Sequence, residues 1–201
     1  GPNLAVFDTA TWQMKTFETR DKFYLKKVFW AKDRVILEAS DRTRDDFLSQ
    51  LDPATGKISG RLVITSPINP AYDRSPVIQL KAMCTNADGT RMAITYQHPQ
   101  EIDSTLKIVN LQTLALEKSM PLSSDDVLNS CVYSPDGRHL FLQNAFGPIR
   151  IVDTQRYQQI GSIPHKVSNG GLAISRDGKR LAIGQETELL IYRLDPPASH
   201  D

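Results

Sequence analysis

The chain lacks the features that mark several protein classes. Its 201 residues include only two cysteines, too few for a disulfide framework, and their spacing does not suit a metal-ligand pair. No apolar run approaches the roughly 18 residues that a membrane-spanning helix needs. The first residues also lack the charged segment and apolar core of a signal peptide. We therefore expect no membrane span in this sequence.

A surplus of one charge is missing as well. The chain has 24 basic and 23 acidic residues, a net charge of +1, and no basic block. Because nucleic-acid-binding surfaces show as clusters of Lys and Arg, we expect no nucleic-acid partner. Gly1-Pro2 is typical of the remnant that a cleaved purification tag leaves, so what precedes Asn3 in the natural protein stays open.

Helical periodicity is absent too, apart from room for one turn between Ser123 and Asn129. A strand–turn–strand unit recurs instead. Its clearest copy has the turn Ser134-Pro135-Asp136-Gly137, in which Pro and Asp suit the central positions and Gly the left-handed one. Two more copies, at Asp88-Gly89 and Asp177-Gly178, lie 48 and 41 residues away. A degenerate copy around Asp33 has lost the Gly.

A second signal alternates with the first. A short strand ends in an acidic or amide residue and leads into another strand, after Phe7, Leu51, Val109 and Val152, spaced 44, 58 and 43 residues apart. Tyr192 follows 40 residues later without a partner strand. Four strands per repeat of this length is the size of a propeller blade. We therefore predict an all-β fold, a β-propeller of four-stranded antiparallel blades, with about four to five blades' worth of chain.

These motifs resemble a known family. The run Ser134 to Phe141 and the segment Ile151-Val152-Asp153-Thr154 are similar to the signature of β-propellers of the YVTN and WD40-like repeat type, and the resemblance covers about three and a half blades. The Trp-Asp and Gly-His pairs of true WD40 repeats are missing, which favours a divergent or YVTN-like propeller. The strand count along the chain predicts a partial blade at 1–20, blades at 25–65, 78–121 and 128–164, a partial blade at 171–194 and a tail at 195–201.

In this scheme the chain begins on the third strand of one blade and ends on the third strand of another. Its two ends therefore do not complete a single blade together. A seven-bladed ring needs roughly 300 residues. We therefore favour a segment of a larger propeller over a ring that closes irregularly.

Three connections are longer than the turns require, and binding residues concentrate on such loops. They are the charged segment Asp41 to Asp46, the proline-rich segment Ser66 to Pro76, and Gln97 to Ser104. The residues that we expect to contact a partner are Asp41, Arg42, Arg44, Asp45, Tyr72, Arg74, His98 and Glu101.

No constellation in the sequence suggests chemistry. Asp88, Asp136 and Asp177 are explained by their turns, and the four histidines are scattered. We therefore predict no catalytic residue, no metal site and no cofactor. Trp12 and Trp30 are expected to pack between blades.

The two cysteines lie on first strands of neighbouring blades. Cys84 precedes its turn Asp by four residues and Cys131 by five. A shift of one residue turns a side chain to the other face of a sheet, so we expect two buried free thiols and no disulfide. Unpaired thiols favour a reducing interior such as the cytoplasm, although the compartment stays open.

Two functions fit these observations. The favoured one is a non-catalytic protein–protein interaction or scaffold module, part of a larger protein or assembly. Its partner would be another protein, a second copy of the chain, or the remaining blades of a parent chain. The alternative, which the resemblance alone implies, is a YVTN-type propeller enzyme or ligand-binding domain of the lactonase-like kind.

Overall fold

Every regular element that the structure describes is a β-strand. The computed structural model describes residues 4–17, 23–40, 46–64, 79–97, 104–122, 128–165, 170–185 and 188–194. These ranges contain seventeen strands and no helix, as predicted for an all-β protein. No described segment therefore provides a helix long and apolar enough to cross a membrane.

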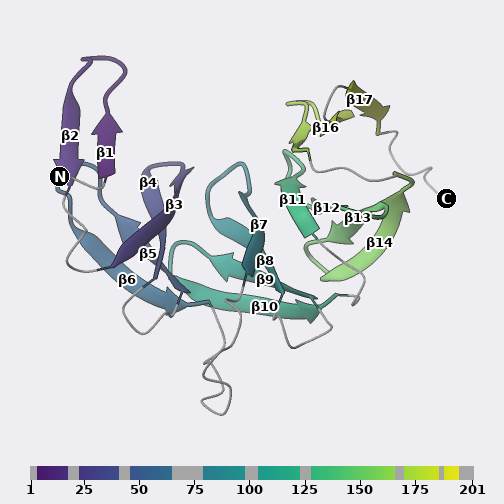
Figure 1. Ribbon diagram of the computed structural model, residues 1–201, viewed down its shortest axis with the longest axis horizontal. Coiled ribbons are helices and arrows are strands. Elements are labelled where there is room, and N and C mark those ends of the chain that lie inside the picture. Colours follow the sequence, from purple (N-terminus) through teal and green to yellow (C-terminus); the bar gives the residue numbers. More distant parts are fainter. Residues whose placement is uncertain are drawn as a thin grey trace, which may run out of the picture. The chain divides into compact units, whose positions relative to one another are not determined.

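The strands form five antiparallel sheets (Figure 1). Two strands make a hairpin: β1 (Leu4–Phe7) and β2 (Met14–Phe17). Three sheets have four strands each: β3 (Tyr24–Ala31), β4 (Arg34–Ser40), β5 (Asp46–Leu51), β6 (Ile58–Val63); β7 (Gln79–Thr85), β8 (Arg91–Gln97), β9 (Ser104–Asn110), β10 (Ala115–Pro121); β11 (Leu128–Tyr133), β12 (His139–Asn144), β13 (Ile149–Asp153), β14 (Gln158–Ile163). The last sheet has three strands: β15 (Leu172–Ile174), β16 (Arg180–Gln185) and β17 (Glu188–Arg193).

Within each sheet, consecutive strands are hydrogen-bonded neighbours. This up-and-down order is that of a propeller blade, and the prediction of four-stranded antiparallel blades is confirmed. The chain divides into two compact units, residues 1–75 with 113–115 and residues 76–112 with 116–201. The first unit holds the hairpin and the β3–β6 blade. The second holds the β11–β14 blade, the β15–β17 sheet and most of the β7–β10 blade.

The Asp-Gly turns are built as the sequence predicts. In the β11–β12 turn the Ser134 N–H donates to the His139 carbonyl oxygen at 2.8 Å, and Gly137 has a φ of +71°. Gly89 and Gly178 adopt the same left-handed conformation, with φ of +68° and +72°. A residue with a Cβ atom is strained in this region, which explains the recurring glycine. In the degenerate copy Lys32 takes the left-handed conformation instead, with φ of +57°.

The turn between the third and fourth strands repeats with equal regularity. Its first residue accepts backbone N–H groups through a side-chain oxygen, as in Asp153, whose Oδ1 lies 2.8 Å from the Gln155 nitrogen and 2.9 Å from the Arg156 nitrogen. Its fifth residue always has positive φ. The four residues at this position are Trp12 (+58°), Gly56 (+74°), Leu114 (+50°) and Tyr157 (+54°).

The core lies between sheets, because alternate side chains of one strand point to opposite faces. One face of the β11–β14 blade packs against the β7–β10 blade through residues such as Leu140 and Leu142. Its other face packs against the β15–β17 sheet through Phe141 and Ile149. In the first unit, Leu4 of the hairpin packs against the β3–β6 blade. Within each unit, neighbouring sheets are therefore held together face to face.

A β-bulge recurs opposite a buried polar side chain. The register of the first strand shifts between Leu25 and Lys27, between Leu80 and Ala82, and between Leu128 and Ser130. The residues paired just after these shifts are equivalent positions of the second strand: Glu38, Thr95 and Gln143, with 2%, 1% and 0% of their surface exposed. A bulge interrupts regular pairing and makes room for such a group.

The bulge partner in the first blade, Glu38, is the only one of the three that can carry a charge. Thr95 Oγ1 accepts a hydrogen bond from the Ala82 nitrogen at 3.0 Å, whereas Glu38 Oε2 is buried without a hydrogen-bond partner. Burial raises the pKa of the Glu38 carboxyl, an effect that the neighbouring Lys27 and Lys26 partly offset. The ionised carboxylate is thus disfavoured in the folded state.

We expect Glu38→Gln to stabilise the protein at neutral pH by roughly 1 kcal/mol, because it removes a buried charge and introduces the side chain that the third blade already carries at this position. The pKa of Glu38 is raised on folding, so the penalty grows as pH rises through the folded pKa and is absent below the ordinary value of 4.5. The gain should therefore vanish in acid. Urea unfolding at pH 7 and pH 4 measures it, with the exposed Glu188→Gln as control; an equal gain at both pH values would contradict this account.

Candidate functional site

The eight residues predicted to contact a partner lie outside the described residues. They are Asp41, Arg42, Arg44, Asp45, Tyr72, Arg74, His98 and Glu101. Ser40 pairs with Asp46 and Gln97 pairs with Ser104, so two of the three connections join adjacent strand ends. The binding role of these loops stays a prediction.

The described residues form a cleft of about 610 Å³ between the turns of the β7–β10 and β11–β14 blades. Its lining is polar and comes from both Asp-Gly turns and from the start of β10. Arg91 Nε forms an ion pair with Glu117 Oε2 at 2.9 Å, and Asn110 Nδ2 donates to Glu117 Oε1 at 3.0 Å. Because both charged side chains are partly exposed, the pair orders the cleft more than it stabilises the fold.

The carboxylates of this cleft are held by their own turns. Asp88 Oδ1 accepts from the Thr90 hydroxyl at 2.6 Å, and Asp136 Oδ1 accepts from the Ser134 hydroxyl at 2.6 Å. These hydrogen bonds are the main reason that the pKa of each carboxyl lies below its ordinary value. The predicted structural role of both aspartates is confirmed. Among the residues that the structure describes, no group of three or more His, Cys, Asp or Glu side chains lies close enough to hold a metal ion.

Tyr133 lies behind the same region and was not singled out from the sequence. Its side chain is almost fully buried, and its hydroxyl has no hydrogen-bond partner. Burial raises the pKa of the Tyr133 hydroxyl, which therefore stays protonated at neutral pH. An unpaired buried hydroxyl is uncommon, and the sequence offers no signal for it.

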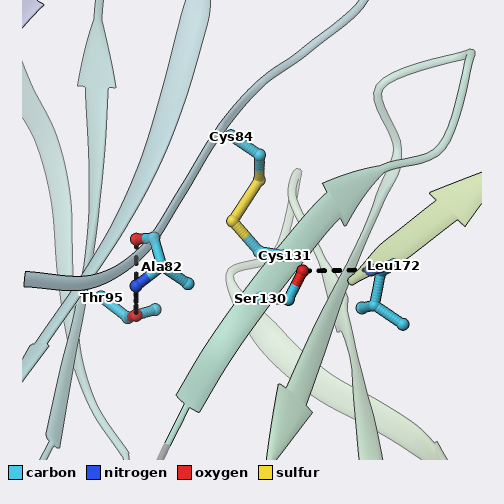
Figure 2. The surroundings of a disulfide bond; sticks show 6 residues. All are labelled: Ala82, Cys84, Thr95, Ser130, Cys131 and Leu172. Carbon is cyan, nitrogen blue, oxygen red and sulfur yellow. Dashed lines mark hydrogen bonds between the residues drawn. A yellow bond between two sulfur atoms is a disulfide. The ribbon is translucent and has the colours of Figure 1, made fainter. Parts of the chain in front are cut away.

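The two cysteines correct the sequence analysis. Cys84 of β7 and Cys131 of β11 form a disulfide, with their Cα atoms 5.8 Å apart (Figure 2). The expectation of two free thiols is wrong. The inferred one-residue shift is real, but neighbouring blades face each other, so side chains on opposite faces of successive blades point toward one another. The shift is what brings the two sulfur atoms together.

The disulfide belongs to a series of links between first strands. Figure 2 shows Ser130, next to Cys131 on β11, accepting a hydrogen bond through Oγ from the Leu172 nitrogen of β15 at 3.2 Å. β11 is thus joined covalently to β7 and by a hydrogen bond to β15. Stable disulfides are typical of oxidising compartments, so the cysteines no longer favour a reducing interior.

Exposed apolar side chains gather at the tip of the β1–β2 hairpin. We call Phe7, Trp12 and Met14 the hairpin patch; their exposed fractions are 53%, 74% and 59%. Phe7 and Met14 are directly paired across the hairpin, and the rings of Phe7 and Trp12 meet edge to face, with centroids 6.1 Å apart. The expected packing of Trp12 between blades is therefore wrong, and so is that of Trp30, which is also exposed.

Trp12 combines two features that are unfavourable for stability: a left-handed backbone conformation and an exposed aromatic ring. Its positive φ is unfavourable for any residue with a side chain, and its indole is mostly in water. At the equivalent turn positions, Gly56 avoids the strain, whereas Leu114 and Tyr157 are half-buried and gain packing. Trp12 has neither advantage, apart from its contact with Phe7. An exposed aromatic at a strained position indicates a role outside folding.

Comparison with known proteins establishes the fold. No protein-family model and no curated protein sequence matches the chain, whereas 1022 chains of solved structures match its fold. One is a chain of Kuenenia stuttgartiensis hydrazine synthase, a β-propeller-containing protein, with a TM-score of 0.70 and 14% identity over 94% of this chain. The present chain spans 64% of the length of that chain. The fold is a β-propeller fold, and a fold so widely shared does not determine function.

Reducing the disulfide should destabilise the protein by up to about 4 kcal/mol, because the link closes a long loop in the unfolded chain. Its cysteines are 47 residues apart in sequence. Thermal melts with and without a reductant measure the effect. The double variant Cys84→Ser with Cys131→Ser should melt lower and be indifferent to reductant. Two thiols that react with maleimide in the unreduced, unfolded protein would contradict the link.

Tyr133→Phe should leave the free energy of unfolding unchanged or raise it by up to about 1 kcal/mol, because it deletes a buried hydroxyl that has no partner. Chemical unfolding at neutral pH measures the change. Tyr157→Phe is the matched control, since its hydroxyl lies 3.5 Å from Glu117 Oε2. A clear loss of stability in Tyr133→Phe alone would show that the hydroxyl has a partner.

Proposed function

We propose that this propeller is a non-catalytic protein-interaction module, of the divergent YVTN or WD40-like repeat type, and that the hairpin patch is its main contact surface. The observation that carries the proposal is Trp12, an exposed aromatic kept in a strained backbone conformation. Selection for stability alone favours Gly at this position, as in the next blade. Contact with another protein at this surface explains why an aromatic side chain is kept at this position.

The composition of the patch suits a protein partner. Trp, Phe and Met are enriched in the centres of protein interfaces, where single aromatics contribute most of the binding energy. Phe7 holds the indole edge to face, and the Asp8 carboxylate accepts the Ala10 and Thr11 N–H groups at 2.8 and 3.0 Å. The patch is thus ordered before binding, which reduces the entropy lost on association.

The aspartates in the turns between strands support the same proposal. The turn aspartates Asp52, Asp88, Asp136 and Asp177 each accept hydrogen bonds from within their own turn. These bonds lower the pKa of each carboxyl. Carboxylates fixed in this way are poorly suited to proton transfer at neutral pH, since an effective general base has a pKa near the working pH.

Trp12→Gly separates folding from binding. Removing the left-handed strain gains roughly 1–2 kcal/mol, and losing the contact with Phe7 costs about 0.5–1.5 kcal/mol, so the free energy of unfolding should change little. Partner binding should weaken at least about tenfold, as for the loss of an interface hot spot.

The measurement is affinity capture from an extract of the source cells, with the captured proteins quantified against the unaltered chain. Phe146→Ala is the matched control, because Phe146 is 70% exposed and lies outside the hairpin patch. A partner that is retained by the control and lost by Trp12→Gly supports the proposal. Retention of every partner by Trp12→Gly, or turnover of a lactone substrate by the purified chain, would overturn it.

A further inference from the structure

The last sheet exposes an apolar face. Alternate residues of β15–β17, such as Leu181, Ile183 and Leu190, pack against the β11–β14 blade. The residues between them therefore point to the opposite side. We call four of these the open face: Ala173, Ala182, Leu189 and Ile191. Leu189 and Ile191 are 66% and 62% exposed.

The open face repeats a surface that the preceding blade buries. The backbone hydrogen bond from Ser175 to Arg180 corresponds to the bond from Ser134 to His139, and the strand registers carry this equivalence through both sheets. The equivalents of the open face in the β11–β14 blade are Val132, Phe141, Ile149 and Ile151. All four pack against the β15–β17 sheet.

The same pattern holds one blade earlier. The equivalent residues of the β7–β10 blade are Cys84, Ala93, Leu106 and Ile108, all in the cluster shared with the β11–β14 blade. These positions are thus apolar in three successive sheets and packed against a neighbouring sheet in two of them. The open face has the chemistry of a blade-to-blade contact, and its occupant should be another blade-like sheet.

The hairpin patch has the complementary chemistry. The turns at Asp8 and Asp153 are equivalent, so Phe7 corresponds to Val152, which packs against the preceding blade. In a pair of packed blades, the residue at the Phe7 position contacts the face of the preceding blade that corresponds to the open face. The open face also has alanines where the preceding blade has Val132 and Phe141, which leaves room for bulky rings.

We propose that the open face of one molecule binds the hairpin patch of a second copy of this chain. The contact joins two different surfaces, so it is heterologous: repeated between copies, it covers both apolar surfaces in a closed ring or a chain of molecules. The inference rests on the proposed function, because it names the partner of the hairpin patch.

A complementation experiment tests the pairing directly. Phe7→Glu disables the hairpin patch and Ile191→Glu disables the open face; both residues are exposed, so folding should survive, which thermal melts verify. Light scattering over a concentration series should give the unaltered chain at least twice its mass of 22.5 kDa. Each variant alone should dimerise at least about tenfold more weakly, because a charge is introduced into the apolar contact.

An equimolar mixture of the two variants keeps one intact contact, between the hairpin patch of one and the open face of the other. It should form a dimer at concentrations where each variant alone is monomeric. Phe146→Glu, which alters neither surface, should dimerise like the unaltered chain.

Three results would overturn the inference: a monomeric unaltered chain at all concentrations, a dimer indifferent to Ile191→Glu, or a mixture that stays monomeric because the hairpin binds elsewhere. If the chain is monomeric but Trp12→Gly still loses a captured partner, the proposed function stands and only the second copy is excluded. If dimerisation is restored in the mixture, both are supported.

Discussion

Face-to-face packing of neighbouring sheets is the constraint on which the rest of this structure depends. A blade between two others has both faces covered, so its middle strands have little polar surface. The β12 strand, in the blade whose two faces pack against the β7–β10 and β15–β17 sheets, is buried along nearly its whole length. This is the pattern of a strand with two covered faces, and it explains why its buried polar residue Gln143 lies opposite a bulge. It also explains why an uncovered blade face is apolar.

The connections between strands accept local strain to keep this packing. Trp12, Leu114 and Tyr157 adopt left-handed conformations so that each hairpin can turn within five residues. Half-buried side chains offset the strain where a neighbouring surface is available. Trp12 lacks this offset, and for that reason the tip of the first hairpin points to a function in contact with another molecule.

Local features were predictable from the sequence, and contacts between blades were not. The Asp-Gly turns and the strands around them follow from residue preferences over a few positions, as at Ser134 to Gly137. The Cys84–Cys131 disulfide was missed because the two side chains meet only when two sheets face each other. The bulges opposite Glu38, Thr95 and Gln143 leave no sequence signature, since a bulge changes register without requiring a special residue. The exposure of Trp12 depends on which surfaces neighbouring sheets cover.

The hairpin patch and the open face are two described surfaces that have apolar, exposed residues at blade-packing positions. The account therefore makes one central claim, that these surfaces cover each other between molecules. Hydrogen exchange of the unaltered chain at low and high protein concentration tests it most directly. We predict that amides of β1–β2 and β15–β17 gain protection together as concentration rises, while those of β11–β14 stay constant. Protection that is independent of concentration at both surfaces would contradict the claim.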